Sequence, residues 1–155
     1  MPRPTPPPTC LAIAVVVAAR READREIAEA RQSAQRAETV GAILTAPDLV
    51  RFNLSGGTAV ERAYAQVLWS RTRGLVLSAS RLPVPPPETT YQLWLLTNGE
   101  PVNAGVFVPD ATGRGSLVSP TPPRVASPVT GAEVTIEPSG GRSTPSGRAL
   151  LVRLP

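Results

Sequence analysis

The stretch TYQLWLLT, from Thr90 to Thr97, is followed by Asn98-Gly99 and then by EPVNAGVFV, from Glu100 to Val108. Both flanking runs are rich in the aromatic, β-branched and long aliphatic residues that are common in strands. An Asn-Gly pair accepts positive φ at both central positions of a tight turn, as a two-residue type I′ loop requires. We therefore predict a β-hairpin whose two-residue loop is Asn98-Gly99.

Apolar runs with a period of two continue on both sides of this hairpin. In LVRFNL, for example, Val50, Phe52 and Leu54 fall on one face of an extended chain. Further runs span residues 63–69, 74–79, 115–118, 132–138 and 149–154, and turn signals lie at Ser55–Gly57, Asp110–Gly113 and Pro138–Arg142. About eight short strands at nearly regular spacing predict an all-β, antiparallel domain over residues 47–155, either sandwich-like or a partly open barrel.

Two long connections in this region carry several prolines, Pro83–Pro87 and Pro120–Pro128. Proline cannot donate to a strand ladder, so these segments do not belong to central strands. We expect both of them to cross between sheets.

The N-terminal 46 residues have a different character. Residues 1–9 are proline-rich, and we expect them to be disordered. Residues 10–19, CLAIAVVVAA, form a short apolar segment that would rise about 15 Å as a helix, half of a bilayer's hydrocarbon core. Three interpretations remain open for it: a membrane anchor or its remnant, a signal sequence cleaved after Ala19, or the apolar start of an ordinary helix.

Residues 20–46 predict one long connecting helix, because Ala, Arg, Glu and Gln dominate them. Alternating spacings of four and three give a seam at Ala23, Ile27, Ala30, Ala34, Ala37, Gly41 and Leu44. Alanine buries little area, so a solvated helix is favoured over a stable coiled coil. Pro47 should end the helix, since it disfavours helical geometry at Ala46.

The composition argues against several classes of function. The sequence has one cysteine, Cys10, and no histidine, so it lacks the commonest zinc ligands and the commonest general base. Its 16 basic residues are all arginine and are spread along the chain, with a net charge of +4. A nucleic-acid binder would instead cluster its arginines and interleave aromatic residues among them. We therefore expect no enzyme, no metal, no cofactor and no nucleic-acid partner.

The few groups that could carry chemistry also favour structural roles. Glu133 and Glu137 lie on one predicted strand about 13 Å apart, too far for a glycosidase pair, and we expect both carboxylates to be solvated. Asp110 supplies one carboxylate, which is too few for calcium. Tyr91 and Trp94 point to opposite faces of their strand, which allows one of them to be exposed to a sugar or a peptide. Packing of both in the core or between sheets is favoured.

The order of these motifs resembles the extracytoplasmic C-terminal domain of the anti-sigma-K factor (RskA) family. The similarity covers about residues 45–155, beginning at Ala46-Pro47-Asp48 after the helix. The residues that carry the family motif, all expected to be structural, are Trp69, Tyr91, Gln92, Trp94, Gly99, Gly105, Phe107, Pro109, Asp110, Glu137 and Pro138. The sigma-binding domain that precedes this domain in the family is not found in the sequence.

The resemblance implies a non-enzymatic regulatory or sensor domain of an anti-sigma-factor-like protein at the cell membrane, with the domain on the extracytoplasmic side. It also implies a membrane contact through residues 10–19, an indirect link to a sigma factor, and cleavage by proteases. The alternative from the residues alone is a secreted β-sandwich module that binds a glycan or a peptide after cleavage following Ala19.

Overall fold

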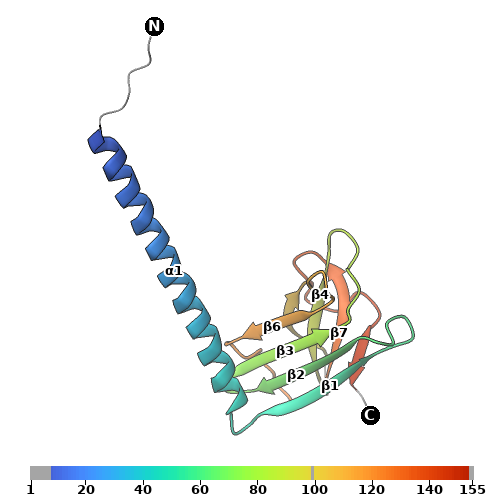
Figure 1. Ribbon diagram of the computed structural model, residues 1–155. Coiled ribbons are helices and arrows are strands. Elements are labelled where there is room, and N and C mark those ends of the chain that lie inside the picture. The colour runs from blue at the N-terminus through green and yellow to red at the C-terminus, as the bar shows by residue number, and fades with distance from the viewer. Residues whose placement is uncertain (1–7, 99, 154–155) are drawn as a thin grey trace. The chain divides into compact units, whose positions relative to one another are not determined.

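The computed structural model describes residues 8–98 and 100–153 (Figure 1). The chain divides into two compact units, Met1–Glu38 and Thr39–Pro155. Residues 1–7, the larger part of the start predicted to be disordered, lie outside the described residues, whereas Pro8 and Thr9 are helical. Proline fits the first turn of a helix, where its missing N–H is no loss. Disorder of the proline-rich start stays a prediction.

One helix, α1 (Pro8–Leu44), contains both the apolar segment and the arginine- and glutamate-rich segment predicted to be helical. It ends two residues before the predicted Ala46. The Thr45 amide and hydroxyl both donate to the Gly41 carbonyl, which caps the last turn. No helix among the described residues is long and apolar enough to cross a membrane.

Within its described residues, the second unit contains eight strands, in the places that the alternating pattern predicts. They are β1 (Val50–Gly56), β2 (Tyr64–Ser70), β3 (Gly74–Ser80), β4 (Thr89–Thr97), β5 (Val102–Phe107), β6 (Gly115–Ser119), β7 (Val129–Pro138) and β8 (Leu151–Arg153). All neighbours are antiparallel. The all-β class with a leading helix is confirmed.

The strands form one sheet in the order β5-β4-β7-β8-β1-β2-β3-β6, rather than two separate sheets. Figure 1 shows β1, β2, β3 and β6 of this sheet side by side. The sheet curls so strongly that its edge strands meet: a β-carbon on Gly105 in β5 would lie 2.8 Å from Leu117 in β6. The domain is therefore a partly open barrel. The proline-bearing connections join strands that are not neighbours, β3 to β4 and β6 to β7, so they cross between parts of one sheet and not between two sheets.

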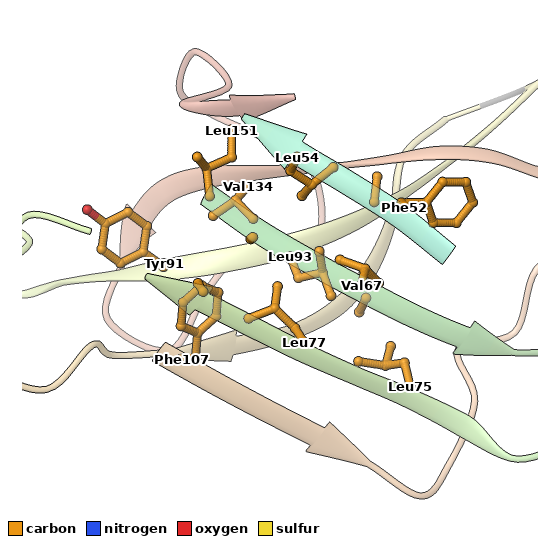
Figure 2. Packing of buried hydrophobic residues seen from close by; sticks show 14 of the residues in the cluster. Phe52, Leu54, Val67, Leu75, Leu77, Tyr91, Leu93, Phe107, Val134 and Leu151 are labelled. Atoms are coloured by element: carbon orange, nitrogen blue, oxygen red, sulfur yellow. The ribbon is translucent and has the colours of Figure 1, made fainter. Parts of the chain in front are cut away.

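The interior of the curled sheet is filled by side chains from alternate strand positions, as Figure 2 shows for Leu77, Leu93 and Val67. The rings of Tyr91 and Phe107 stack with centroids 5.6 Å apart. Each fully buried large apolar side chain contributes about 1.5–3 kcal/mol to burial free energy. This core is the main source of the domain's stability.

Two predicted turns differ from the structure. The ladder of β1 continues through Ser55 and Gly56, because these residues pair with β2 and β8. The connection between β4 and β5 spans residues 98–101 and is longer than the predicted two residues. Pro101 has no N–H for the ladder, which delays the start of β5. The hairpin itself is confirmed, and Gly99 lies outside the described residues.

Candidate functional site

Strand β4 is buried on both faces, which is unusual for a strand of a small barrel. Tyr91 and Leu93 point into the core, while Gln92 and Trp94 lie on the opposite face, and all four are 0% exposed. The expectation that Tyr91 or Trp94 could be exposed is therefore wrong. Tyr91 packs in the core as favoured, whereas Trp94 is buried on the outer face of β4 and not in the core cluster. The Tyr91 hydroxyl donates to the Pro83 carbonyl at 3.0 Å, and burial raises the pKa of this phenol.

The outer face of β4 is covered by the segment that follows β7, residues 139–148, which we call the cover segment. The side-chain amide of Gln92 binds the backbone of Arg142 twice, donating to its carbonyl and accepting from its N–H, each at 2.8 Å. A β-carbon on Gly141 would come within 2.7 Å of Gln92 and Val106. The glycine therefore allows the cover segment to lie directly on β4 and β5.

A chain of buried hydrogen bonds runs under the cover segment. The Trp94 indole N–H donates to the Thr135 hydroxyl at 2.9 Å, and that hydroxyl donates to the Glu137 carboxylate at 2.7 Å. Glu137 also accepts from the backbone N–H of Ser146 at 3.0 Å and from the Ser146 hydroxyl. We call Gln92, Trp94, Thr135 and Glu137 the polar layer.

Glu137 is 1% exposed, so the expectation of a solvated carboxylate is wrong at this position. Burial alone would raise the pKa of Glu137, but the hydrogen bonds from Ser146 and Thr135 outweigh it and hold the pKa below its ordinary value. Glu133 lies on the same face of β7 and is half-buried. Burial raises the pKa of Glu133. The pKa values of the two carboxyl groups are therefore shifted in opposite directions from their ordinary value.

A second polar cluster joins the end of α1 to the β2–β3 turn. The Ser70 hydroxyl donates to the Asp48 carboxylate at 2.6 Å, and the hydroxyl and amide of Thr72 donate to it at 3.1 and 3.2 Å. These bonds, that from Ser70 foremost, lower the pKa of Asp48. Ile43 and Ala46, on either side of the helix end, are buried in this unit. We call Asp48, Ser70 and Thr72 the junction clamp.

Asp110 organises the turn between β5 and β6. One carboxylate oxygen accepts the Thr112 hydroxyl at 2.6 Å, the Thr112 amide at 2.8 Å and the Arg114 amide at 3.0 Å. The Thr112 hydroxyl contributes most to lowering the pKa of this carboxyl group. Asp110 is therefore a turn cap whose lone pairs point into its own loop.

The remaining motif residues that the structure describes lie in the core and at the ends or irregularities of strands. Phe107 stacks in the core, and Gly105 has a φ of 128° beside a β-bulge in β5, where Leu93 pairs with Gly105 and Trp94 with Asn103. Pro109 precedes the Asp110 turn, and Pro138 ends β7 and accepts the Gly141 amide. Trp69 is 4% exposed, and within the described residues its indole nitrogen has no hydrogen-bond partner.

Sequence reasoning missed the polar partners of these motif residues. Thr135, Ser146, Ser70 and Thr72 are small polar residues with no distinctive pattern of their own. The one available signal was that Thr135 and Glu137 share a face of β7 with Glu133. That this face of β7 is buried becomes visible only in the structure, where the cover segment returns onto it.

The hydroxyl–carboxylate contacts of this arrangement, Ser70 with Asp48 and Ser146 with Glu137, hold loops in place. In the part of the chain that the structure describes, no three His, Cys, Asp or Glu side chains gather where they could hold a metal ion. Each carboxylate with hydrogen-bond partners is bound by hydroxyl and amide donors that fix loops.

Comparison with known proteins assigns this fold to a family. The model of the anti-sigma-K factor RskA C-terminal domain matches residues 8–149. The chain belongs to this family. The anti-sigma-K factor RskA of Mycobacterium ulcerans is 34% identical over 111 residues, which cover 70% of this chain and 44% of that protein. An uncharacterized protein in the phr 5′ region of Streptomyces griseus is 29% identical over 121 residues, covering 76% of this chain and 47% of that protein.

The chain thus spans about half the length of these curated relatives. No solved structure matches it. Membership of an anti-sigma-factor C-terminal family supports a role in regulation, and the matched region contains both the polar layer and the junction clamp.

Proposed function

We propose that residues 39–155 form the extracytoplasmic sensor domain of an anti-sigma-factor-like protein at the cell membrane, and that α1 connects the domain to that membrane. The single observation that carries the proposal is the family match over residues 8–149, which extends from the helix through the whole barrel. In this proposal the domain controls a sigma factor only indirectly, through other parts of the intact protein.

The residues of the polar layer and the motif act as structure in this proposal. Gln92 and Glu137 hold the cover segment, Asp110 holds the β5–β6 turn, and Phe107 fills the core. The contacts among these residues hold strands and loops in place, and in this proposal the domain acts by changing conformation or by being cleaved.

The junction clamp supports a route by which the state of the barrel reaches the helix. Asp48 follows the last turn of α1 by four residues and is bound to the β2–β3 turn by three hydrogen bonds. A change in β2 or β3 would therefore alter the restraint on the helix end. The proposed signal passes from the barrel to α1 through these bonds.

The location is tested by fusing alkaline phosphatase, which is active only outside the cytoplasm, after Pro155. The proposal expects an active fusion in the membrane fraction. An active fusion released into the medium, with a mature N-terminus at Arg20, would instead support the secreted module that binds a glycan or a peptide. An inactive fusion protein in the cytosol would contradict both the membrane-attached and the secreted location.

The regulatory role is tested by removing residues 47–155 from the chromosomal gene and measuring the transcriptome. The proposal expects one set of co-regulated promoters to change its expression. The double variant Asp48→Asn with Ser70→Ala should shift the same set in the same direction while the folded barrel remains. An unchanged transcriptome for the deletion would contradict the regulatory role.

A further inference from the structure

The β1–β2 loop, the start of the β3–β4 connection and the β5–β6 turn enclose an open cavity of about 600 Å³ at one end of the barrel. A second cavity of about 410 Å³ adjoins it and shares Arg81 and Thr112 with it. Neither cavity contains a residue of the polar layer or of the junction clamp. Together we call them the basic cavity.

Three arginines line the basic cavity, Arg62, Arg81 and Arg114, and Glu61 is the one acidic residue among its lining residues. None of the three arginines has a salt bridge within the described residues. Asp110 lies near Arg114, but its carboxylate is already bound by amides and a hydroxyl of its own turn. Asp110 nevertheless keeps its negative charge, because its pKa is lowered, so Asp110 and Glu61 offset part of the charge of the three arginines. The cavity therefore keeps a net positive charge, which attracts anions.

The walls of the cavity are fixed before any ligand binds. The Leu82 amide donates to the Gly113 carbonyl at 3.0 Å, and a β-carbon on Gly113 would lie 2.7 Å from the Leu82 carbonyl oxygen. On the other side, the amide of Val60 donates to Gly57 and that of Ala63 to Val60, at 2.9 and 2.8 Å. Preorganised walls lower the entropic cost of binding.

Arg81 itself is held in a left-handed conformation, with a φ of 58°. A residue with a β-carbon adopts this conformation only at a cost, and such strain clusters at ligand sites. Asparagine or glycine would satisfy the backbone better, yet this position has the long side chain that lines both cavities. Charge and strain are two independent observations that point to the same residue.

The apolar residues that line the cavity narrow the chemical class of the ligand further. Val60, Leu82, Pro83 and Val84 line the larger cavity, and Val84 is 78% exposed. An arginine fork binds phosphate or carboxylate oxygens in pairs, while these side chains can cover an apolar body. We propose that the basic cavity is a binding site for a small organic anion, with a phosphate or carboxylate head on the arginines and an apolar body against the valine and proline wall.

The test is calorimetric titration of the full chain with phenyl phosphate in 150 mM salt, with inorganic phosphate and benzyl alcohol as the head and body alone. The site predicts saturable binding of phenyl phosphate with a dissociation constant of about 1 mM or tighter, and weaker binding of both parts. Equal binding of benzyl alcohol and phenyl phosphate would overturn the proposal.

Arg81→Asn is the decisive variant, because it removes the charge and relieves the backbone strain together. We expect at least tenfold weaker binding of phenyl phosphate with an unchanged or higher melting temperature. Arg71→Asn removes the same charge beyond the opposite end of β2 and should bind as the unaltered chain does. Equal affinity of the Arg81 and Arg71 variants for phenyl phosphate would also overturn the proposal.

Vesicles distinguish a soluble anion from a lipid headgroup, since both present the same chemistry. Sedimentation with phosphatidylglycerol vesicles that requires Arg81 and is competed by phenyl phosphate would assign the anion to a lipid. Binding of phenyl phosphate without sedimentation would assign it to a soluble metabolite. Both results support the anion site, and they leave the proposed regulatory function to its own tests above.

Discussion

The Ser70 hydroxyl donates a 2.6 Å hydrogen bond to the carboxylate of Asp48, which lies 22 residues earlier, just beyond the end of α1. Ser70 is 0% exposed and also accepts the amides of Thr72 and Arg73, so this one hydroxyl links the helix exit to the β2–β3 turn. The restraint on the helix end is therefore a side-chain contact and not a continuation of secondary structure.

Replacing Asp48 with asparagine should loosen the junction clamp. Asparagine keeps the size but loses the charge that strengthens hydrogen bonds from Ser70 and Thr72. We expect faster hydrogen exchange at the amides of Thr72 and Arg73 and unchanged exchange at Arg142, measured by mass spectrometry or NMR. Asp24→Asn, on the exposed helix, is the matched control and should change none of the three.

The same clamp should respond to acid. Its hydrogen bonds, that from Ser70 foremost, hold the pKa of Asp48 below its ordinary value. A depressed pKa means that the stabilising contribution is present above the unfolded pKa of about 3.9 and is lost as the pH falls through the folded value. The difference in exchange between the parent chain and Asp48→Asn should therefore be full at pH 7 and shrink below about pH 4. A difference that grows on acidification would contradict this account.

The two glutamates of β7 form an internally matched pair. Glu137→Gln should lower the free energy of unfolding by about 1–3 kcal/mol at pH 7, because Gln presents an NH₂ group where Ser146 and Thr135 donate. Glu133→Gln, four positions earlier on the same face, should leave stability unchanged or raise it, because burial already disfavours its charge. Urea unfolding measures both. Equal destabilisation by the two changes would rule out a specific role for Glu137.

The pH dependence of this pair should have opposite signs. The pKa of Glu137 is lowered, so the cost of Glu137→Gln should fade as the pH drops through the folded pKa, below the ordinary value of 4.5. The pKa of Glu133 is raised, so its charge is penalised above the folded pKa, and any gain from Glu133→Gln should vanish below 4.5. Measuring the free energy of unfolding of both variants at pH 3, 5 and 7 distinguishes the two dependences.

Thr135→Val should break the hydrogen-bond chain of the polar layer without leaving a cavity. Valine matches threonine in shape but can neither accept the Trp94 indole N–H nor donate to Glu137. The change leaves the Trp94 N–H unpaired and removes one of the hydrogen-bond donors to Glu137, which should cost about 2–3 kcal/mol of unfolding free energy. Thr130→Val, at an exposed position of β7 whose hydroxyl bonds to Leu96, should cost less than about 0.5 kcal/mol.

Alanine substitutions at two adjacent glycines of the cover segment can distinguish the cost of backbone strain from the cost of a steric clash. Gly140 and Gly141 have φ values of 91° and 78°, but a β-carbon meets atoms within 4 Å only at Gly141. Gly140→Ala should cost about 1–2 kcal/mol for its backbone alone. Gly141→Ala should cost at least about 1 kcal/mol more, because its methyl group would displace Gln92 from Arg142. A smaller effect at Gly141 than at Gly140 would mean that the cover segment lies loosely on β4.

The sequence alone determined the strands of this domain, because each alternating run, such as Val50, Phe52 and Leu54, can bury only one face. It also determined the hairpin of β4 and β5, while the position of Pro101 lengthened the loop beyond the Asn-Gly expectation. The family was recognisable from the same region, since Tyr91, Trp94 and Phe107 are spaced as in its motif. These are local properties, because each depends on residues that lie close together in the sequence.

Only the tertiary structure decided what lies on the outer face of β4 and β7. A period of two assigned Glu137 to a face, but nothing local shows that residues 139–148 return to cover it. Gln92 meets Arg142 across 50 positions and Asp48 meets Ser70 across 22, and such contacts depend on how the sheet curls. The basic cavity is the same kind of result, since Arg62, Arg81 and Arg114 are scattered in the sequence and converge only when three loops meet at one end of the barrel. Alternation determines which side of a strand a residue occupies, whereas the closing of the sheet determines what that side faces.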